Sequence, residues 1–312
     1  MSKIDRPATA SPHVEEALKP ILYADIFDYP LTFDEIYRFL EFKTTRETLR
    51  ILLDQALADQ SIMECDGFYS LADRPHLAAE RQERWAAAQD LWPKATHYGH
   101  WMATLPFVRM VAVTGSLAVE NPRNGVDDID YLIVTQPGRL WFCRAIIILL
   151  VRYAHLRGVH LCPNFLLTEN VLYFADNNLF IAREMVQMVP LYGRAAYLSM
   201  RQMNAWVVDY LPHGTDLNLQ RLDDDLALSQ RWLKKVGERL LGGTLGDWVE
   251  TPLQTFQINK HLRLAKKYGA DDKVIFTADQ CRGHIDGHHN RVMDAYQGRV
   301  KKYNQTAEGI YQ

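Results

Sequence analysis

The sequence lacks the features that mark several classes of protein. Its four cysteines are scattered and include no CxxC pair, so the sequence indicates neither a disulfide framework nor a zinc finger. No apolar run is long enough to cross a bilayer, because Arg144 and Arg152 interrupt the most apolar segment, residues 140–156. We therefore expect reduced thiols, a cytoplasmic location and no membrane partner.

A strong charge of either sign is also lacking. The net charge of the 312-residue chain is −3, which argues against non-specific coating of nucleic acid. Internal repeats and low-complexity segments are absent from the sequence. Since 48% of the residues are hydrophobic, the chain can bury a sizeable core in one large domain or two to three smaller ones.

The N-terminal part of the chain has a compact pattern of its own. Residues 1–12 predict a flexible arm, and residues 13–73 predict three helices followed by a β-hairpin. Thr32 and Glu35 have the spacing of a helix capping box, which Thr44 and Glu47 repeat. Asp66-Gly67 indicates the two-residue hairpin turn. Three helices and a hairpin resemble a winged-helix domain.

Winged helices often bind DNA, so their charge is informative. Residues 1–73 contain 7 Lys and Arg against 14 Asp and Glu, a net charge of −7. Phosphate repulsion opposes DNA binding by such a surface. We therefore do not expect duplex DNA as a partner, and favour contact with a protein or a spacer role for this region.

The remaining chain predicts an α+β fold with a small mixed sheet. Residues 74–107 predict linking helices, and residues 193–312 are mainly helical. Between them, residues 108–192 alternate strands and helices: strands at 108–114, 160–168 and 171–174, and helices at 139–157 and 178–188.

The stretch VTGSLAVENPRNGVDDIDYLIV, residues 113–134, carries the chemistry of this segment. Gly115 allows a tight turn, and Ser116 can begin a short helix, which Pro122 should stop, so that free N–H groups could hold a phosphate. Asp128 and Asp130 are two residues apart, which puts both on one face of a strand. Two such carboxylates repel unless a cation lies between them, and hard oxygen ligands suit Mg²⁺ or Mn²⁺.

Gly-Ser followed after eleven residues by Asp-Ile-Asp and an apolar strand resembles the signature of the nucleotidyltransferase superfamily, with the DNA polymerase beta-like fold. The resemblance implies a core over residues 108–192 in which Gly115 and Ser116 contact the triphosphate of an NTP. It also implies that Asp128 and Asp130 hold the divalent metals that align the α-phosphate and neutralise the pyrophosphate.

Superfamily members usually have a third carboxylate on a later strand, often as the base for the acceptor hydroxyl. Here that strand has Asn164, which cannot act as a base. Glu169, at the far end of the strand, and Glu184, in the next helix, are the alternatives. Arg123 and Asn124, in the loop between the motif halves, could contact phosphate or acceptor.

These residues predict a nucleotidyltransferase that moves an NMP from an NTP to an acceptor and releases pyrophosphate. The acceptor could be a small molecule, a protein or RNA, because the metal site does not specify it. One alternative is a non-catalytic nucleotide-binding regulator whose winged helix binds DNA or protein. Another is a toxin-type transferase that modifies tRNA or protein.

Overall fold

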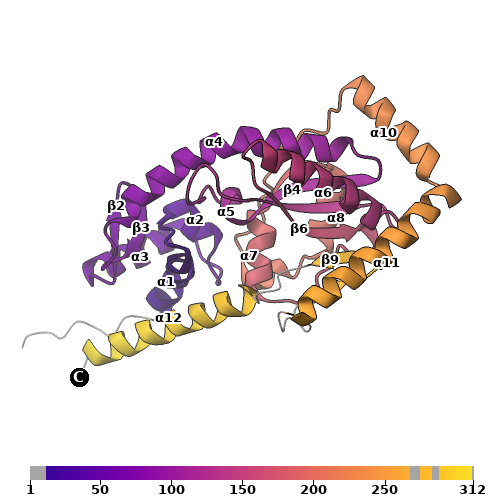
Figure 1. Cartoon of the computed structure of the whole chain (residues 1–312). Coiled ribbons are helices and arrows are strands. Elements are labelled where there is room, and N and C mark those ends of the chain that lie inside the picture. The colour runs from indigo at the N-terminus through magenta and orange to yellow at the C-terminus, as the bar shows by residue number, and fades with distance from the viewer. Residues whose placement is uncertain (1–11, 268–274, 283–287, 311–312) are drawn as a thin grey trace, which may run out of the picture.

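The computed structural model describes residues 12–267, 275–282 and 288–310. The expected flexible arm therefore lies outside the described residues, apart from Pro12, at which the first helix begins. The fold is mixed α+β, as the sequence predicted, and is built on one small and one larger sheet. Figure 1 shows the small sheet and its helices on one side of the molecule and the larger sheet on the other.

Residues 12–71, called here the N-terminal region, contain three helices and three short strands. The helices are α1 (Pro12–Ala24), α2 (Phe33–Arg38) and α3 (Arg46–Ala58), and the strands are β1 (Leu31–Thr32), β2 (Ile62–Cys65) and β3 (Phe68–Leu71). The strands form an antiparallel sheet in the order β1-β3-β2. The predicted hairpin turn is present, because Asp66 and Gly67 both have positive φ, as a type I′ turn requires.

The larger sheet has six strands in the order β7-β4-β5-β6-β9-β8. Strands β5 and β6 are parallel and the other pairs are antiparallel. The strands span β4 (Val108–Thr114), β5 (Ile129–Thr135), β6 (Leu161–Thr168), β7 (Val189–Tyr192), β8 (Ile275–Phe276) and β9 (Gln280–Arg282). The sheet thus takes two strands from a part of the chain that the sequence predicted as helix and loops.

Helices cover both faces of this sheet. Alternate residues of β5 belong to different clusters: Tyr131 and Ile133 pack on the side of α4 (Leu77–Thr104) and α6 (Leu140–Leu156), and Leu132 and Val134 pack on the side of α7 (Leu179–Gln187). The first side also has α11 (Thr244–Lys267) after α10 (Leu228–Leu241), and the second has α8 (Arg194–Met203), α9 (Val207–Tyr210) and α12 (His288–Ile310). Asp130 shares the period of Leu132 and therefore points toward α7.

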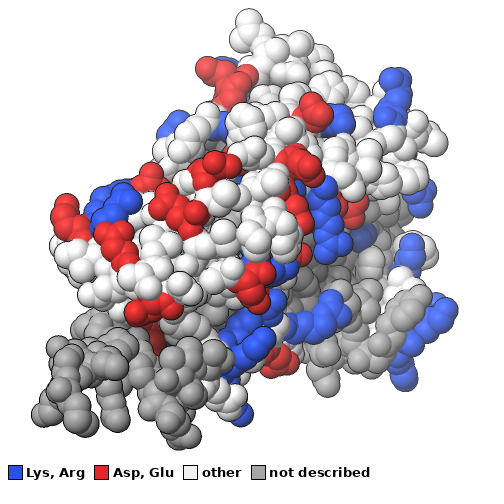
Figure 2. All heavy atoms as spheres, turned by 90° about the vertical axis from the view of Figure 1, so that its left-hand side faces the viewer, with Lys and Arg blue, Asp and Glu red and all other residues white. Residues whose placement is uncertain are grey.

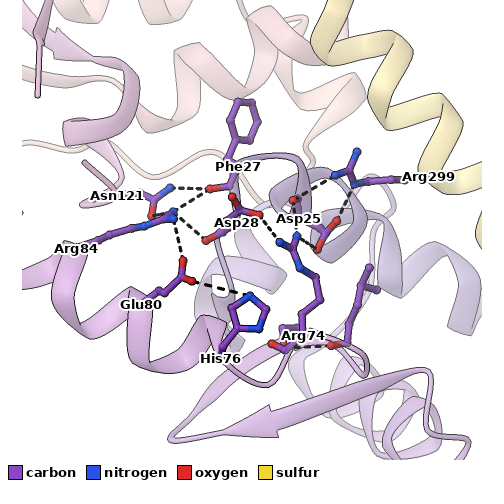
Figure 3. Close-up of polar contacts among 11 residues, drawn as sticks. Asp25, Phe27, Asp28, Arg74, His76, Glu80, Arg84, Asn121 and Arg299 are labelled. Carbon is purple, nitrogen blue, oxygen red and sulfur yellow. Dashed lines mark hydrogen bonds and ion pairs between the residues drawn. The ribbon is translucent and has the colours of Figure 1, made fainter. Parts of the chain in front are cut away.

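Two helices join the N-terminal region to the sheet. Helix α4 runs along one side of both parts, and α12 crosses the opposite side beneath α1 (Figure 1). Arg74 and Arg299 both bond to Asp25, which follows α1 and is 7% exposed. Arg84 of α4 donates to the carbonyl oxygens of Phe27 and Asp28 and to Asn121 Oδ1, at 3.0, 3.0 and 3.1 Å (Figure 3). The segment after α1 is therefore fixed against the loop that follows β4.

Two local predictions are wrong, and at each place a tertiary contact is made instead. The cap of α3 is Thr45, whose side chain accepts from Thr48 N, because Thr44 N is bonded to His213 instead. Residues 171–174 are not a strand: Glu169–Val171 form a 3₁₀ turn, and Phe174 N donates to Asn204 Oδ1. The capping box of Thr32 and Glu35 is confirmed.

The surface gives two further facts. Within the described ranges, no helix combines the length and apolarity that a membrane crossing needs. Figure 2 shows the side of the molecule that carries the N-terminal region, where acidic and basic side chains are interspersed among uncharged ones. Arg46 of α3 lies 2.5 Å from Asp34 and 4.8 Å from the Tyr37 ring, so this basic side chain is engaged within the region itself.

Candidate functional site

The Gly-Ser turn and the Asp-Ile-Asp strand meet at one end of the larger sheet. Thr114, the last residue of β4, lies opposite Asp130 in the antiparallel pair β4–β5. Gly115 follows with a φ of +66°, and a Cβ built on it would lie 2.2 Å from Asp130 Oδ2. Only glycine fits both this conformation and this approach. The two halves of the motif therefore form one site, in which backbone and carboxylate are in direct contact.

Strand β6 contributes Asn164 to this site through a bulge. The register of β5 and β6 shifts after the pair Tyr131–Pro163, so that Asn164 is an extra residue without an opposite partner. Its amide nitrogen donates to Asp130 Oδ1 at 2.5 Å, and its amide oxygen lies 3.0 Å from Cys162 Sγ. The residue found where the third acid was expected thus holds the carboxylate of Asp130 in place.

Glu184, on α7, is the candidate third acid that lies near Asp130. Burial raises the pKa of Asp130 to about 7, and Asp128 adds to the shift. Burial likewise raises the pKa of Glu184 to about 7, with Asp130 as the second cause. Gln187 donates to Glu184 Oε1 at 2.6 Å. Asp130 thus raises the pKa of the neighbouring Glu184, and at such a pair of partly buried acids a proton or a cation can offset negative charge.

Asp127 and Asp128, which precede β5, lie in different surroundings. The side chain of Asp128 is 65% exposed, and its Oδ1 lies 3.8 Å from His160 Nδ1. Asp127, which the sequence did not suggest as a ligand, accepts from Arg123 N at 2.9 Å and borders the same pocket as Asp130. Both carboxylates are close enough to Asp130 to raise its pKa.

Of the other predicted residues, some border the pocket beside Asp130 and others lie away from it. Ser116 and Arg123 border the pocket beside Asp130. Asn124 Oδ1 accepts from Val126 N at 3.0 Å and closes a local turn in the exposed loop. Glu169 lies 3.8 Å from Arg109, beyond the far end of β6 and roughly 20 Å along the strand from the residue paired with Asp130. Glu169 is therefore not part of the site.

The helix expected after Ser116 is shorter than predicted. Helix α5 comprises only Gly115–Ala118, and Glu120 already has a positive φ. Four residues sum to little helix dipole, so α5 cannot attract a phosphate as a longer helix would. Any phosphate bound here must rely on the backbone of Gly115, the hydroxyl of Ser116 and nearby arginines.

The site opens into a cavity of about 310 Å³ between the N-terminal region and the larger sheet, called here the central pocket. This volume is at the lower end of the range for small-molecule sites. Its sheet side includes Gly115, Ser116, Arg123, Asp127, Asp130 and Glu184. Its other side carries rings from the N-terminal region, namely Tyr23, Phe27, Tyr29 and Phe39. The N-terminal region is therefore one wall of the pocket.

Sequence reasoning missed Arg183, which also borders the central pocket. Arg183 precedes Glu184 on α7, is 4% exposed and lies 3.8 Å from the centre of the Tyr23 ring. The two partners are separated by 160 positions, and an Arg in a helix is ordinary, so the sequence held no signal for this contact.

The residues present fit a divalent metal by their chemistry. Asp128, Asp130 and Glu184 supply carboxylate oxygens, and Mg²⁺ typically takes one or two carboxylates together with phosphate oxygens and water. Within the described residues, no three acidic, His or Cys side chains are already grouped as a metal site. Phosphate oxygens and water would complete the ligands of a metal bound here.

Comparison with known proteins adds no relative, because no protein family, curated protein or solved structure matches this chain.

Proposed function

We propose that this protein is a metal-dependent nucleotidyltransferase that moves an NMP from an NTP to an acceptor hydroxyl and releases pyrophosphate. The observation that carries the proposal is the contact of Gly115 with Asp130, since a Cβ at this glycine would lie 2.2 Å from Asp130 Oδ2. This contact joins the two halves of the Gly-Ser and Asp-Ile-Asp motif into one site, which the resemblance to nucleotidyltransferases requires.

Each residue has a role in this reaction. Asp130 and Asp128 would hold Mg²⁺ or Mn²⁺, which when bound offsets charge on the phosphates. The N–H of Gly115, the hydroxyl of Ser116 and the side chain of Arg123 would bind the triphosphate tail. Asn164 keeps the Asp130 carboxylate oriented through its 2.5 Å hydrogen bond.

Glu184 suits the role of the base. The acceptor oxygen bonds to the α-phosphorus, the bond from that phosphorus to the bridging oxygen of pyrophosphate breaks, and the acceptor proton passes to Glu184. Burial raises the pKa of Glu184 to about 7, which matches a base that works near neutral pH. Asn164 cannot take this proton, and Glu169 lies too far away.

The alternative of a DNA-binding regulator has less support. Residues 1–73 carry a net charge of −7. Arg46 and Arg50 of α3, the arginines closest to a recognition surface, lie over the rings of Tyr37 and Phe33 at 4.8 and 4.2 Å. The wall of rings in the central pocket gives the N-terminal region a role within the site itself.

Calorimetric titration with each NTP in the presence of Mg²⁺ tests the proposal. We expect saturable binding of at least one NTP to the intact chain, and strongly weakened binding to the double variant Asp128→Ala/Asp130→Ala. Equal Mg²⁺-NTP affinity of the two proteins would overturn the proposal. A filter-binding assay with duplex DNA at two salt concentrations tests the alternative, because true DNA contact weakens steeply with salt.

A further inference from the structure

Arg183 is a buried cation without the partners that a buried cation normally has. Its side chain is 4% exposed, and neither Nε nor Nη2 has a hydrogen-bond partner among the described residues. No carboxylate of the described residues lies within ion-pair distance of it. A buried charge in this state is costly, because its lost hydration is not replaced. Burial accordingly lowers the pKa of Arg183.

Aromatic rings fix the position of this guanidinium. Its central carbon lies 3.8 Å from the centre of the Tyr23 ring and 4.9 Å from that of Phe39. Rings stabilise a cation through their faces, which leaves the N–H groups at the edge of the guanidinium plane to donate elsewhere. Tyr23 is fixed in turn by Tyr296 of α12, at 5.4 Å between ring centres.

The other arginine that joins the two walls is fully engaged. Arg84 also borders the central pocket, but it donates to Phe27 O, Asp28 O and Asn121 Oδ1 and pairs with Glu80. Its role is to hold the pocket wall (Figure 3). Arg183 has no hydrogen-bond partner at Nε or Nη2 among the described residues, and it borders the same cavity of about 310 Å³.

We propose that the central pocket binds a small molecule that carries a phosphate or carboxylate group, which accepts hydrogen bonds from Arg183. The planar guanidinium can donate two parallel hydrogen bonds to either group. The apolar part of the molecule packs against the rings of Tyr23 and Phe39. This assignment rests on the proposed function: the anionic small molecule is the acceptor. We prefer it to a protein or an RNA end because the pocket is too small for a polymer segment.

The first experiment asks whether the pocket binds an anion attached to a ring. Isothermal calorimetry and thermal-shift measurements would use phenyl phosphate and benzoate as probes, with benzyl alcohol as the neutral control, all without metal. We expect saturable binding of at least one anionic probe and at least about tenfold weaker binding of benzyl alcohol. No saturable binding of either anion, or equal binding of the alcohol, would overturn the proposal.

Variants locate the binding. Arg183→Met should lose the anion-induced shift in Tm, and Arg183→Lys should keep part of it, because Lys retains the charge but not the two-pronged geometry. Arg194→Met is the matched control, since Arg194 is 50% exposed on α8 and should leave anion binding unchanged. A purely structural Arg183 predicts the reverse, with a lower Tm for Arg183→Met and an unchanged anion-induced shift, and that result would overturn the proposal.

A competition experiment distinguishes binding at an acceptor site from binding at the nucleotide site. If the anion site belongs to the acceptor, phenyl phosphate or benzoate and Mg²⁺-ATP should bind together. Mutual displacement, with weakened ATP binding to Arg183→Met, would assign Arg183 to the nucleotide's own phosphates and overturn the acceptor assignment. Asp130→Asn should retain binding of the anionic probe, so loss of metal-nucleotide binding and loss of anion binding are observed independently.

Discussion

The two ends of β4 hold charged groups in opposite ways. At its start, Lys234 of α10 is 8% exposed and donates to the carbonyl oxygens of Ala103 and Val108 at 2.6 and 2.7 Å. At its end, Gly115 touches Asp130, which lies among other acids and receives one 2.5 Å hydrogen bond from Asn164. Arg183, which borders the same central pocket, has two nitrogens without hydrogen-bond partners among the described residues.

This difference separates structural charge from charge that is open to a ligand. Hydrogen bonds from Lys234 to two carbonyl oxygens compensate it within the fold, although burial lowers its pKa to about 8. At the other end of β4 several acids and an arginine with two unpartnered nitrogens instead border one cavity. Substitutions should therefore affect stability at the first end and ligand binding at the second.

The largest effect is expected for Asp130→Asn on metal binding. The variant keeps the size of the side chain and its contact with Asn164 but removes the charge that attracts the cation. Losing several kcal/mol of attraction between the carboxylate and the metal should weaken the binding of Mn²⁺ in the presence of an NTP roughly a thousandfold. Titration followed by electron paramagnetic resonance measures this loss. A variant that binds Mn²⁺-NTP as tightly as the intact protein would contradict the assignment.

Lys234→Met should mainly reduce stability. The substitution leaves the carbonyl oxygens of Ala103 and Val108 buried without a donor, at a cost of about 3 kcal/mol in the free energy of unfolding. Urea denaturation followed by circular dichroism measures this cost. The exposed Lys235→Met is the control and should change the unfolding free energy little. If the Met variant at position 234 is as stable as the control, the two ends of β4 do not differ as described.

Gly115→Ala should affect both properties, each moderately. A positive φ disfavours alanine by about 1 kcal/mol, and the added Cβ displaces the Asp130 carboxylate. We expect a lower Tm together with weaker Mn²⁺-NTP binding. Gly125→Ala is a close control, because nothing lies within 4 Å of a Cβ at that position, in the loop that follows α5. Equal behaviour of the two alanine variants would argue against the contact.

The smallest effect concerns the pH at which metal binds. A proton on Asp130 competes with the cation, so affinity should weaken as pH falls through about 7, the raised pKa of this group. The hydrogen bond from Asn164 lowers that pKa, and Asn164→Ala should therefore move the midpoint to higher pH by less than about one unit. Mn²⁺ titrations across pH 5–9 measure the midpoint, and a shift to lower pH would be inconsistent with this role.

Local chemistry explains which parts of the fold could be predicted from the sequence. Strand 108–114 followed by Gly115, and the hairpin turn at Asp66-Gly67, depend on neighbouring residues, so the sequence was sufficient to predict them. Strand β9 could not be predicted, because its three residues join the sheet by pairing with β6 across more than 100 positions. The role of Asn164 likewise depends on a bulge, which the apolar pattern of β6 does not indicate.

The same reasoning applies to the candidate site. Gly115 and Asp130 are close in sequence and belong to one motif, and their contact followed from strand pairing. The choice between Glu169 and Glu184 required the direction of β6 and the position of α7, which no short pattern contains. Arg183 and its rings come from elements far apart in the chain, so the sequence did not suggest them at all.

The position of α12 has a consequence for the order in which the molecule is completed during synthesis. Arg299 of α12 lies 2.7 Å from Asp25, and Tyr296 OH lies 2.6 Å from Glu41. Each N-terminal partner is synthesised more than 250 residues before the α12 residue that it contacts. The nascent chain therefore carries the motif of residues 113–134 long before its pocket is enclosed. A growing chain can form the sheet end of the site early, and the ring wall makes its contacts with α12 only after that helix has been synthesised.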